Sequence, residues 1–417
     1  MSLVLRIEAL GAEGEGITRH EGKVVFVPGA LPGELVELEL AACGARFDRG
    51  EILRIVEPVA ARVPSPCIHE VRDGCGGCAL LHCEARAAAN WKRDVLSELL
   101  LHAGLDAACV EEPRIAGGGL PGSRTHARWV PDRAGRLPWI GRAPAAGRGE
   151  RAPVLVDACL ALHPRLEELR LMLDGQVKGL AAVDIRVAPT TNEALVILEG
   201  EAVPRALAAH DLPASVVLRT KSGDRPLRGH PFIHEVVRGV RFRISAGAFF
   251  QSHKDGPRLL SEIVGECIGD AQPITRAIDL CAGVGLFALT SLAAAQRVLA
   301  VESDPVAAAD LRVNLGKRAG GAVIEETAEA ALNELGDARG AADLLVADPP
   351  RSGLGRQALN ALVRMAPARI VLVSCAPRHF AAEAATLVRA GWTLERCIPV
   401  DQFPGTPHLE VVGLLAR

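Results

Sequence analysis

Cys375 has the surroundings of a reactive side chain. It lies in the segment RIVLVSCAP (residues 369–377), directly after an apolar run that predicts a β-strand, and Pro377 follows two residues later. A free cysteine is most often a small buried hydrophobe. In a turn at the end of a strand, however, the thiol can face a cleft, and its thiolate form is a nucleophile. We therefore expect Cys375 to lie at a reactive site.

Three further cysteines lie close together in the sequence. Cys67, Cys75 and Cys78 form a C-x7-C-x2-C arrangement in CIHEVRDGCGGC, and Cys159 in DACLALHP is the best candidate for a fourth partner. The start of the chain does not resemble an export signal. Because disulfides are rare in the cytosol, clustered cysteines there are better explained as metal ligands. Four cysteines without a paired histidine suit zinc or an iron–sulfur cluster.

A glycine-rich turn follows another predicted strand in AIDLCAGVGLFAL (residues 277–289). Gly283 and Gly285 allow a tight turn and a close approach of the backbone to a ligand at a helix N-terminus. The third glycine of the dinucleotide fingerprint is replaced by Ala288. Glu302 ends the next apolar run, where an acid can accept hydrogen bonds from ribose hydroxyls. The pair predicts an adenosine cofactor, either NAD or S-adenosylmethionine.

Two acids stand beside later apolar runs. Asp348 ends LLVAD and is followed by Pro349, Pro350 and Arg351, which predicts a rigid polar lip at the end of a strand. Ligands of open α/β sheets bind at that edge, where Cys375 is also expected. Glu410 stands just before the final apolar run in QFPGTPHLEVVGLL, where an acid could equally be solvated.

The elements that would position these residues differ along the chain. From about residue 258, apolar runs alternate with alanine-rich helical stretches, which predicts a doubly wound parallel sheet. The last two runs, around 392–400 and 408–415, have little helix between them. A final antiparallel pair of this kind is typical of the methyltransferase version of the fold.

The N-terminal part has another pattern. Residues 2–57 contain short β-rich runs, which suit a small barrel of the OB type. A helix is expected over 82–104, and a mixed segment with β-like runs extends to about 245. We therefore expect three domains: a barrel (1–60), a central α+β domain with the cysteines (61–257) and an α/β domain (258–417).

Composition limits the class of protein. The 417 residues suit two or three domains, and 49% apolar with 23% charged residues indicates a packed globular chain. The net charge of −3 identifies no partner. Two arginine-rich islands, residues 114–151 and 219–243, could contact phosphates, or could simply be solvated surface. Because no apolar run is long enough to span a membrane, we expect a cytoplasmic protein.

Together these motifs resemble one family, the bacterial RNA uracil-5-methyltransferases, and within it the iron–sulfur 23S rRNA enzymes with an N-terminal TRAM domain. The resemblance covers nearly the whole chain. Residues 10–34 resemble TRAM, an RNA-binding barrel, and ISAGAFFQ (244–251) resembles a cofactor-side motif. The CGGC segment, together with Cys67 and Cys159, resembles the family's 4Fe–4S site. DLCAGVGLF, Glu302 and DPPR resemble its cofactor edge, SCAP its nucleophile turn and PHLE its catalytic base.

The resemblance implies methylation of uridine C5 in RNA, with 23S rRNA as the favoured substrate, on a Rossmann-like class I methyltransferase domain. It makes Cys375 the nucleophile, which forms a covalent adduct with uracil C6, and Glu410 the general base. The implied cofactors are S-adenosyl-L-methionine and a 4Fe–4S cluster held by Cys67, Cys75, Cys78 and Cys159. RNA is the implied partner, with no membrane and no obligate protein partner. The implied contacts to S-adenosylmethionine are Gln251, Cys281, Gly283, Gly285, Leu286, Glu302, Thr327 and Asp348.

The chain departs from the family pattern at several positions. Two extra residues separate Cys67 from Cys75, and Ala376 follows the nucleophile where the family usually has Asn or Asp. Leu286 replaces an asparagine and Cys281 an aromatic residue, while Ser252-His253 replaces Val-Asn. These differences bear on contacts and target choice more than on the reaction class.

Two alternatives remain open, and a third is disfavoured. A tRNA uracil-5-methyltransferase would use the same mechanism, and a non-catalytic RNA-binding protein could keep the same fold. RNA cytosine-5-methyltransferases carry a second cysteine in a Pro-Cys turn after strand four. This chain has Pro350-Arg351 there, which disfavours cytosine.

Overall fold

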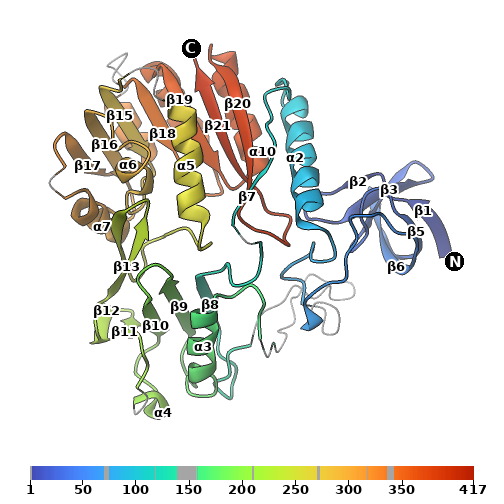
Figure 1. The fold of residues 1–417 in the computed structure, drawn as a ribbon, viewed down its shortest axis with the longest axis horizontal. Coiled ribbons are helices and arrows are strands. Elements are labelled where there is room, and N and C mark those ends of the chain that lie inside the picture. The colour runs from blue at the N-terminus through green and yellow to red at the C-terminus, as the bar shows by residue number, and fades with distance from the viewer. Residues whose placement is uncertain are drawn as a thin grey trace.

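The computed structural model describes residues 2–69, 75–117, 119–138, 156, 158–208, 211–269, 273–316, 318–335 and 342–417. Its larger sheets have six, five and eight strands, and a two-stranded hairpin stands between the last two (Figure 1). Among the described helices, none combines the length and the apolar character needed to cross a membrane.

The N-terminal sheet is strongly bent around a small apolar core. Its strands run in the order β1-β5-β6-β4-β3-β2, and only β4 and β6 pair in parallel. Gly16 lets β3 approach the core, because a Cβ there would lie 2.9 Å from Ile7 Cγ2. This arrangement confirms the expected barrel-like domain, although the sequence had not indicated β3. The bounds are β1 (Ser2–Arg6), β2 (Ala9–Leu10), β3 (Gly16–His20), β4 (Lys23–Val27), β5 (Leu35–Cys43) and β6 (Phe47–Glu57).

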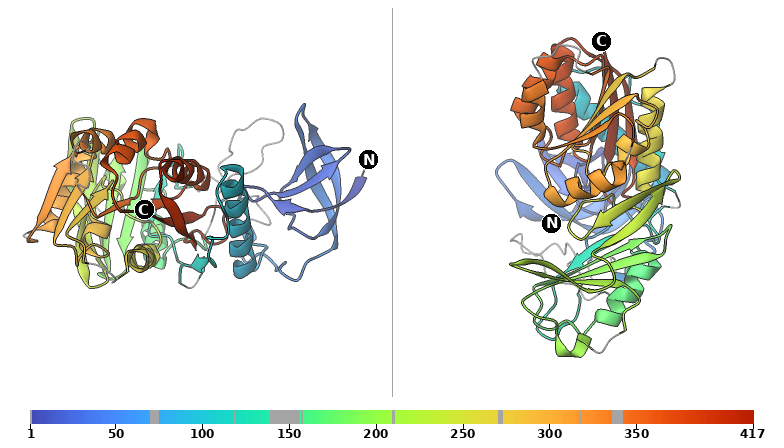
Figure 2. Two further views of the ribbon diagram at one scale, coloured as in Figure 1. Left: turned by 90° about the horizontal axis from the view of Figure 1, so that it is seen from above. Right: turned by 90° about the vertical axis from the view of Figure 1, so that its left-hand side faces the viewer.

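Helix α2 (Ala85–His102) confirms the helix expected over 82–104. Glu84 caps it by accepting hydrogen bonds from the backbone N–H groups of the first turn, and Gly104 follows the helix at a φ of +80°. The helix lies between the N-terminal sheet and the rest of the molecule (Figure 2). Lys92 of this helix forms an ion pair of 2.8 Å with Asp401, and both side chains are only 2% exposed.

The central sheet has the order β12-β11-β10-β9-β8 and is covered on both faces. Leu166, Leu169 and Leu173 of helix α3 (Pro164–Leu173) pack on one face, against Val196 of β10. Leu195, the neighbour of Val196, points to the other face and joins the core that the hairpin helps to form. The bounds are β8 (His126–Trp129), β9 (Ala182–Ala188), β10 (Glu193–Glu199), α4 (Arg205–Ala208), β11 (Ser215–Thr220), β12 (Gly223–Arg228), and β13 (Phe232–Val237) with β14 (Val240–Ser245) for the hairpin.

The C-terminal sheet confirms the doubly wound parallel fold. Its order is β17-β16-β15-β18-β19-β21-β20-β7, and β21 is antiparallel to both of its neighbours. The final antiparallel pair is therefore also confirmed. The strands are β15 (Arg276–Leu280), β16 (Arg297–Glu302), β17 (Gly321–Glu325), β18 (Leu344–Ala347), β19 (Arg369–Ser374), β20 (Thr393–Asp401) and β21 (Glu410–Ala416). The eighth, β7 (Arg114–Ile115), comes from a much earlier part of the chain and pairs in parallel with β20.

Helices cover both faces of this sheet. Buried residues of α5 (Gly256–Ile268), α6 (Leu286–Leu289) and α7 (Pro305–Leu315) pack on one face. The other face carries α8 (Ala328–Leu335), α9 (Gly355–Met365), α10 (Pro377–Arg389) and the buried side of α2. Helix α2 is thus part of the C-terminal core, although it precedes the central sheet in the chain.

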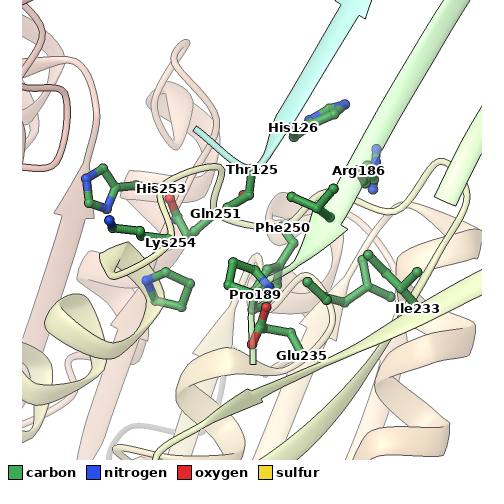
Figure 3. A pocket seen from close by; sticks show the side chains of 14 residues that line it. Thr125, His126, Arg186, Pro189, Ile233, Glu235, Phe250, Gln251, His253 and Lys254 are labelled. Carbon is green, nitrogen blue, oxygen red and sulfur yellow. The ribbon is translucent and has the colours of Figure 1, made fainter. Parts of the chain in front are cut away.

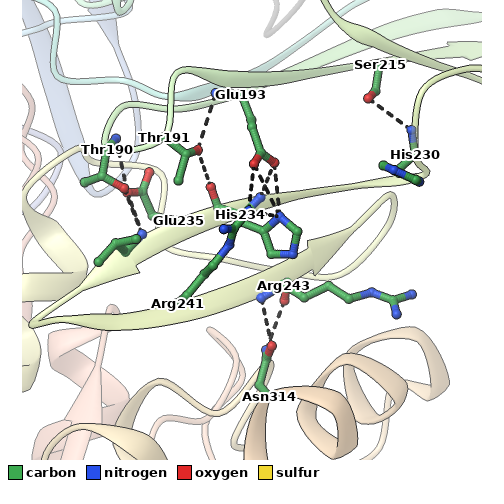
Figure 4. A network of polar contacts seen from close by, with 11 residues as sticks. Thr190, Thr191, Glu193, Ser215, His230, His234, Glu235, Arg241, Arg243 and Asn314 are labelled. Carbon is green, nitrogen blue, oxygen red and sulfur yellow. Dashed lines mark hydrogen bonds and ion pairs between the residues drawn. The ribbon is translucent and has the colours of Figure 1, made fainter.

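A polar network ties the hairpin to the C-terminal domain (Figure 4). The side chain of Asn314 accepts a hydrogen bond of 2.7 Å from Arg243 N and donates to Arg243 O and to Val284 O. Asp310, one turn earlier on α7, accepts from Ser245 N and from Ser245 Oγ. Because Val284 lies in the glycine-rich turn, these bonds hold the end of β14 beside that turn.

We expect the buried Lys92–Asp401 pair to matter for stability. Lys92→Met leaves the Asp401 charge buried without its partner, which should lower the free energy of unfolding by roughly 3–5 kcal/mol. The double variant Lys92→Met/Asp401→Leu should recover much of that loss. The measurement is urea unfolding followed by circular dichroism.

Arg93→Met is the matched control, because its pair with Glu112 is exposed, with side chains 27% and 75% accessible. Such a pair contributes about 0–1 kcal/mol. Equal losses of unfolding free energy in the Lys92 and Arg93 variants would show that burial does not make the Lys92 pair more stabilising than an exposed pair.

Candidate active site

The glycine-rich turn after β15 is held by the acid that ends β16. Gly283 N donates a hydrogen bond of 2.7 Å to Glu302 Oε2, and Asp304 N donates one of 2.7 Å to Glu302 Oε1. Gly285 has a φ of +98°, and a Cβ there would lie 2.7 Å from Leu311 Cδ1, so only glycine fits. The structure therefore brings Gly283, Gly285 and Glu302 together, as the sequence led us to expect.

Three other residues expected at the cofactor lie around this turn in different ways. Cys281 is at its start, and desolvation together with the charges of Glu302 and Asp348 raises the pKa of its thiol to about 12. Leu286 begins α6 with its side chain buried in the apolar core. Thr327 is exposed after β17, and its hydroxyl accepts a hydrogen bond from Ala330 N at the start of α8.

Four side chains form a hydrogen-bonded row across the carboxyl edge of the sheet. Gln251 Nε2 donates to Asp348 Oδ2 at 3.3 Å, and Gln402 Nε2 donates to Gln251 Oε1 at 3.3 Å and to Glu410 Oε2 at 2.9 Å. Sequence reasoning had singled out three of these residues and missed Gln402. Its position in DQFPGTPHLE, eight residues before Glu410, was the only signal that could have indicated it.

The two acids of this row hold their protons more strongly than exposed carboxyls do. Burial raises the pKa of Glu410 to about 7, against the opposing effects of the Gln402 hydrogen bond and the Arg351 charge. Desolvation, the charge of Glu410 and that of Asp279 raise the pKa of Asp348 well above its usual value. Near neutral pH, Glu410 is therefore able both to accept and to release a proton.

Cys375 is half-buried beside these acids. Desolvation and the charges of Glu410 and Asp348 raise the pKa of its thiol, whereas the charge and hydrogen bond of Arg351 lower it. The carbonyl oxygen of Arg351 lies 2.5 Å from His379 Nδ1, which fixes the backbone at this point. Arg351 is thus the cation that stabilises a thiolate at Cys375.

Cys375 opens onto a cleft of about 1070 Å³, which we call the Cys375 cleft. One wall comes from the N-terminal sheet and the loop after β2, another from α2, and a third from the segment before Glu410. The lining residues include Gly11, Glu13, Lys92, Val95, Arg351 and His408. Three distant parts of the chain therefore meet at the thiol.

The four cysteines expected to bind a metal line one pocket, which we call the cysteine pocket. Desolvation and the charges of Cys159, Cys75 and Cys67 raise the pKa of the Cys78 thiol to about 12, while Arg124 lowers it. In the described part of the chain, no three His, Cys, Asp or Glu side chains are placed to hold a single metal ion. Phe403, Pro404 and Thr406, from the segment before Glu410, complete the wall of this pocket.

A further pocket is lined in part by residues of the segment 250–254 (Figure 3). His126, Arg186, Glu235, Phe250 and Lys254 are among its lining residues. His253 borders both this pocket and the cysteine pocket, and desolvation lowers its pKa to about 4, so it is neutral at physiological pH. The Ser252-His253 departure therefore lies between the two pockets.

Ion pairs reduce the charge of the arginine-rich islands. Arg128, Arg228, Arg241 and Arg243 pair with Glu199, Asp211, Glu193 and Asp310, all of them acids from outside the islands. Arg133, Lys221 and Arg225 make no ion pair within the described residues. Arg142, Arg148 and Arg151 lie outside those residues. Counting charges along the sequence thus overstated the positive surface, because acids from other parts of the chain lie beside it.

Comparison with known proteins agrees with this geometry. Residues 206–417 match the family described as tRNA (Uracil-5-)-methyltransferase, and residues 3–53 match the TRAM domain. The chain belongs to the RNA uracil-5-methyltransferase family. The family resemblance inferred from the sequence is therefore confirmed, including the N-terminal TRAM domain.

Relatives of this methyltransferase span its full length. An uncharacterized RNA methyltransferase of Corynebacterium diphtheriae is 30% identical to this chain, and the matched region covers 99% of this chain and 97% of the relative. The 23S rRNA (uracil(1939)-C(5))-methyltransferase of Yersinia enterocolitica is 28% identical, and the match covers 100% of this chain and 95% of that protein. The structure of Pyrococcus abyssi tRNA (uracil-54, C5)-methyltransferase with S-adenosyl-L-homocysteine has a TM-score of 0.75 and 21% identity, and covers all of both chains, which shows the same fold.

The hydrogen bonds of Glu302 predict that this residue strengthens the binding of S-adenosylmethionine. Glu302→Ala removes the anchor of the turn and also the acceptor that the sequence predicts for a ribose hydroxyl. We expect the affinity for S-adenosylmethionine to fall by at least about tenfold, or roughly 1.4 kcal/mol. Isothermal titration calorimetry measures the change.

Glu325→Ala is the matched control, because Glu325 pairs in register with Glu302 on the neighbouring strand but forms its ion pair with Arg312. It should bind the cofactor as the unaltered protein does. Similar losses in both variants would assign the effect to the sheet rather than to the turn.

Proposed function

We propose that this protein methylates C5 of uridine in RNA, with S-adenosyl-L-methionine as methyl donor and 23S rRNA as the favoured substrate. The observation that carries the proposal is the convergence of Cys375, Arg351 and Glu410 at one edge of the C-terminal sheet. The named Yersinia relative favours 23S rRNA. tRNA is the second candidate, because the matching family is described as tRNA (Uracil-5-)-methyltransferase.

The chemistry explains why these side chain types are needed. Uracil C5 is a poor nucleophile. The Cys375 thiolate would add to C6, so that the electrons of the 5,6 double bond form an enolate and C5 becomes nucleophilic. C5 then takes the methyl group, and S-adenosylhomocysteine leaves. Glu410 would remove the C5 proton, and the electron pair of that bond would restore the double bond and expel Cys375 as thiolate.

The surrounding residues would support these steps. Arg351 would stabilise the Cys375 thiolate and the charge that develops on the base. Asp348, whose pKa is raised by burial, would donate a hydrogen bond to the base when protonated or accept one from a cofactor amino group when ionised. Gln251, Cys281, Gly283, Gly285, Leu286, Glu302 and Thr327 would line the cofactor site, Leu286 through its backbone because its side chain lies in the core.

We propose that the cysteine pocket holds a 4Fe–4S cluster. Cys67, Cys75, Cys78 and Cys159 supply four thiols without a histidine, and all four line the same pocket. The Arg124 charge would offset part of their negative charge. No step of the methyl transfer needs an electron, so we assign the cluster a structural or RNA-positioning role. The pocket wall formed by residues 403–406 would then connect the cluster to the segment that leads to Glu410.

The remaining proposals concern organisation and location. We propose three domains, a TRAM domain (1–60), a central cysteine-containing domain (61–257) and a methyltransferase domain (258–417). Helix α2 and strand β7 of the second would complete the core of the third. We further propose that the protein acts on RNA in the cytoplasm without an obligate protein partner.

We expect variants of Cys375 and Glu410 to block the reaction at different steps. Cys375→Ala should abolish methylation and any covalent adduct with RNA. Glu410→Gln should still attack and methylate but stall before elimination, so that a protein–RNA species stable to denaturation accumulates. The measurements are tritium transfer from methyl-labelled S-adenosylmethionine into 5-methyluridine of unmodified rRNA and tRNA, and denaturing gels of labelled RNA.

Glu395→Gln is the control, because Glu395 is an exposed acid on β20. It should methylate normally and leave no adduct. If Cys375→Ala still formed the stable species, Cys375 would not be the nucleophile. Label in methylcytidine or methyladenosine alone would overturn the proposed reaction.

The cluster can be tested by replacing one ligand. Protein purified without oxygen should contain iron and sulfide in about equal amounts. Cys78→Ser should lose the visible absorption and lower the unfolding temperature. Cys43→Ser is the control, because Cys43 is exposed at the end of β5. Stoichiometric zinc in place of iron, in protein prepared without oxygen, would overturn the assignment.

A further inference from the structure

We propose that Gln402 is a positioning residue for Glu410, one that aims the carboxylate and favours its ionised form. The inference rests on the proposed role of Glu410 as general base. Gln402 is 2% exposed. Its Nε2 lies 2.9 Å from Glu410 Oε2 and 3.3 Å from Gln251 Oε1, so one amide joins the base to the residues on the cofactor side.

The orientation of the Gln402 amide follows from its neighbours. An ionised carboxylate only accepts hydrogen bonds, so the N–H side of the amide has to face Glu410. The amide oxygen then points to the first residue of α5, Gly256, where a Cβ would overlap it. Glycine at this position is what leaves room for the Gln402 side chain.

The backbone on both sides of Gln402 is anchored by one buried cation. Lys92 Nζ lies 2.8 Å from Asp401 Oδ2 and donates a hydrogen bond of 3.4 Å to Phe403 O. Phe403 N in turn donates to Asp401 Oδ1 at 3.1 Å. The residues before and after Gln402 are fixed to α2. The backbone of Gln402 is therefore held rigidly while its side chain extends to Glu410.

The charges around Glu410 explain why this hydrogen bond matters. Burial opposes ionisation of Glu410, and Asp348, at the end of β18, and Cys375, after β19, would add to that effect only in their charged forms. Arg351 favours ionisation. Asp401, the nearby acid on β20, is already neutralised by Lys92. Without the Gln402 N–H group, Arg351 alone would stabilise the Glu410 carboxylate, and a higher pH would be needed to ionise it.

The test is the pH dependence of the elimination step in full-length Gln402→Leu. The covalent protein–RNA species is followed by rapid quenching and denaturing gels from about pH 6 to 9. We expect elimination near pH 7 to be about five- to tenfold slower, because a pKa increase of about one unit reduces the ionised fraction by that factor. The rate should recover at the alkaline end, and the affinity for S-adenosylmethionine should stay within about twofold.

Two further variants make the result interpretable. Gln296→Leu makes the same replacement at an exposed glutamine before β16 and should leave the profile unchanged. Gly256→Ala keeps the Gln402 amide but displaces it, and should shift the profile in the same direction by a smaller amount. If Gln402→Leu did not fold, the Gly256→Ala profile would decide the question.

The outcomes separate this inference from the proposed function. If Glu410→Gln stalls as an adduct while Gln402→Leu keeps the original profile, the role of Gln402 is wrong and the base assignment stands. A loss of rate by the same factor at every pH would also overturn the inference, since it would indicate a purely structural effect. If Glu410→Gln forms no adduct, the proposed function itself fails.

Discussion

The Glu410 carboxyl is buried beside a second acid and a thiol, and the rest of the site depends on how its charge is compensated. An ionised carboxylate away from water is costly unless hydrogen bonds and opposite charges surround it. Here the Gln402 amide and the Arg351 guanidinium supply that compensation only in part, and the pKa of Glu410 is raised to about 7. A proton acceptor of this strength suits proton transfer near neutral pH.

The same compensation constrains the neighbouring thiol. A thiolate at Cys375 has to form close to Glu410 and Asp348, whose charges oppose it. Arg351 serves both groups, because its charge favours the thiolate and the Glu410 carboxylate alike. Since Asp348 holds its proton strongly, the site carries less negative charge than its residues would suggest.

The segment from Asp401 to Glu410 connects these groups to the rest of the molecule. Lys92 of α2 fixes its start, Phe403 and Thr406 line the cysteine pocket, and His408 lines the Cys375 cleft. The TRAM domain reaches the same cleft through Gly11 and Glu13. Loss of the proposed cluster, of α2 or of the TRAM contact would therefore act on one short segment that precedes Glu410.

Local pattern in the sequence determined much of this architecture. Strand-and-turn motifs predicted the parallel sheet and placed Glu302, Asp348 and Cys375 at its carboxyl edge, because these signals depend only on neighbouring residues. The spacing of the cysteines indicated a group of four, and the family motif gave Glu410 its expected role. Helix α2 was recognisable from its apolar spacing, although its place in the C-terminal core was not.

Only the tertiary structure decided which distant segments meet. It paired Lys92 with Asp401, placed Gln402 between Gln251 and Glu410, and set acids from other parts of the chain against the arginine-rich islands. It also added β7 to the C-terminal sheet and brought the TRAM domain to the Cys375 cleft. Such contacts depend on how whole elements pack, and neither periodicity nor the spacing of residues along the chain contains that information.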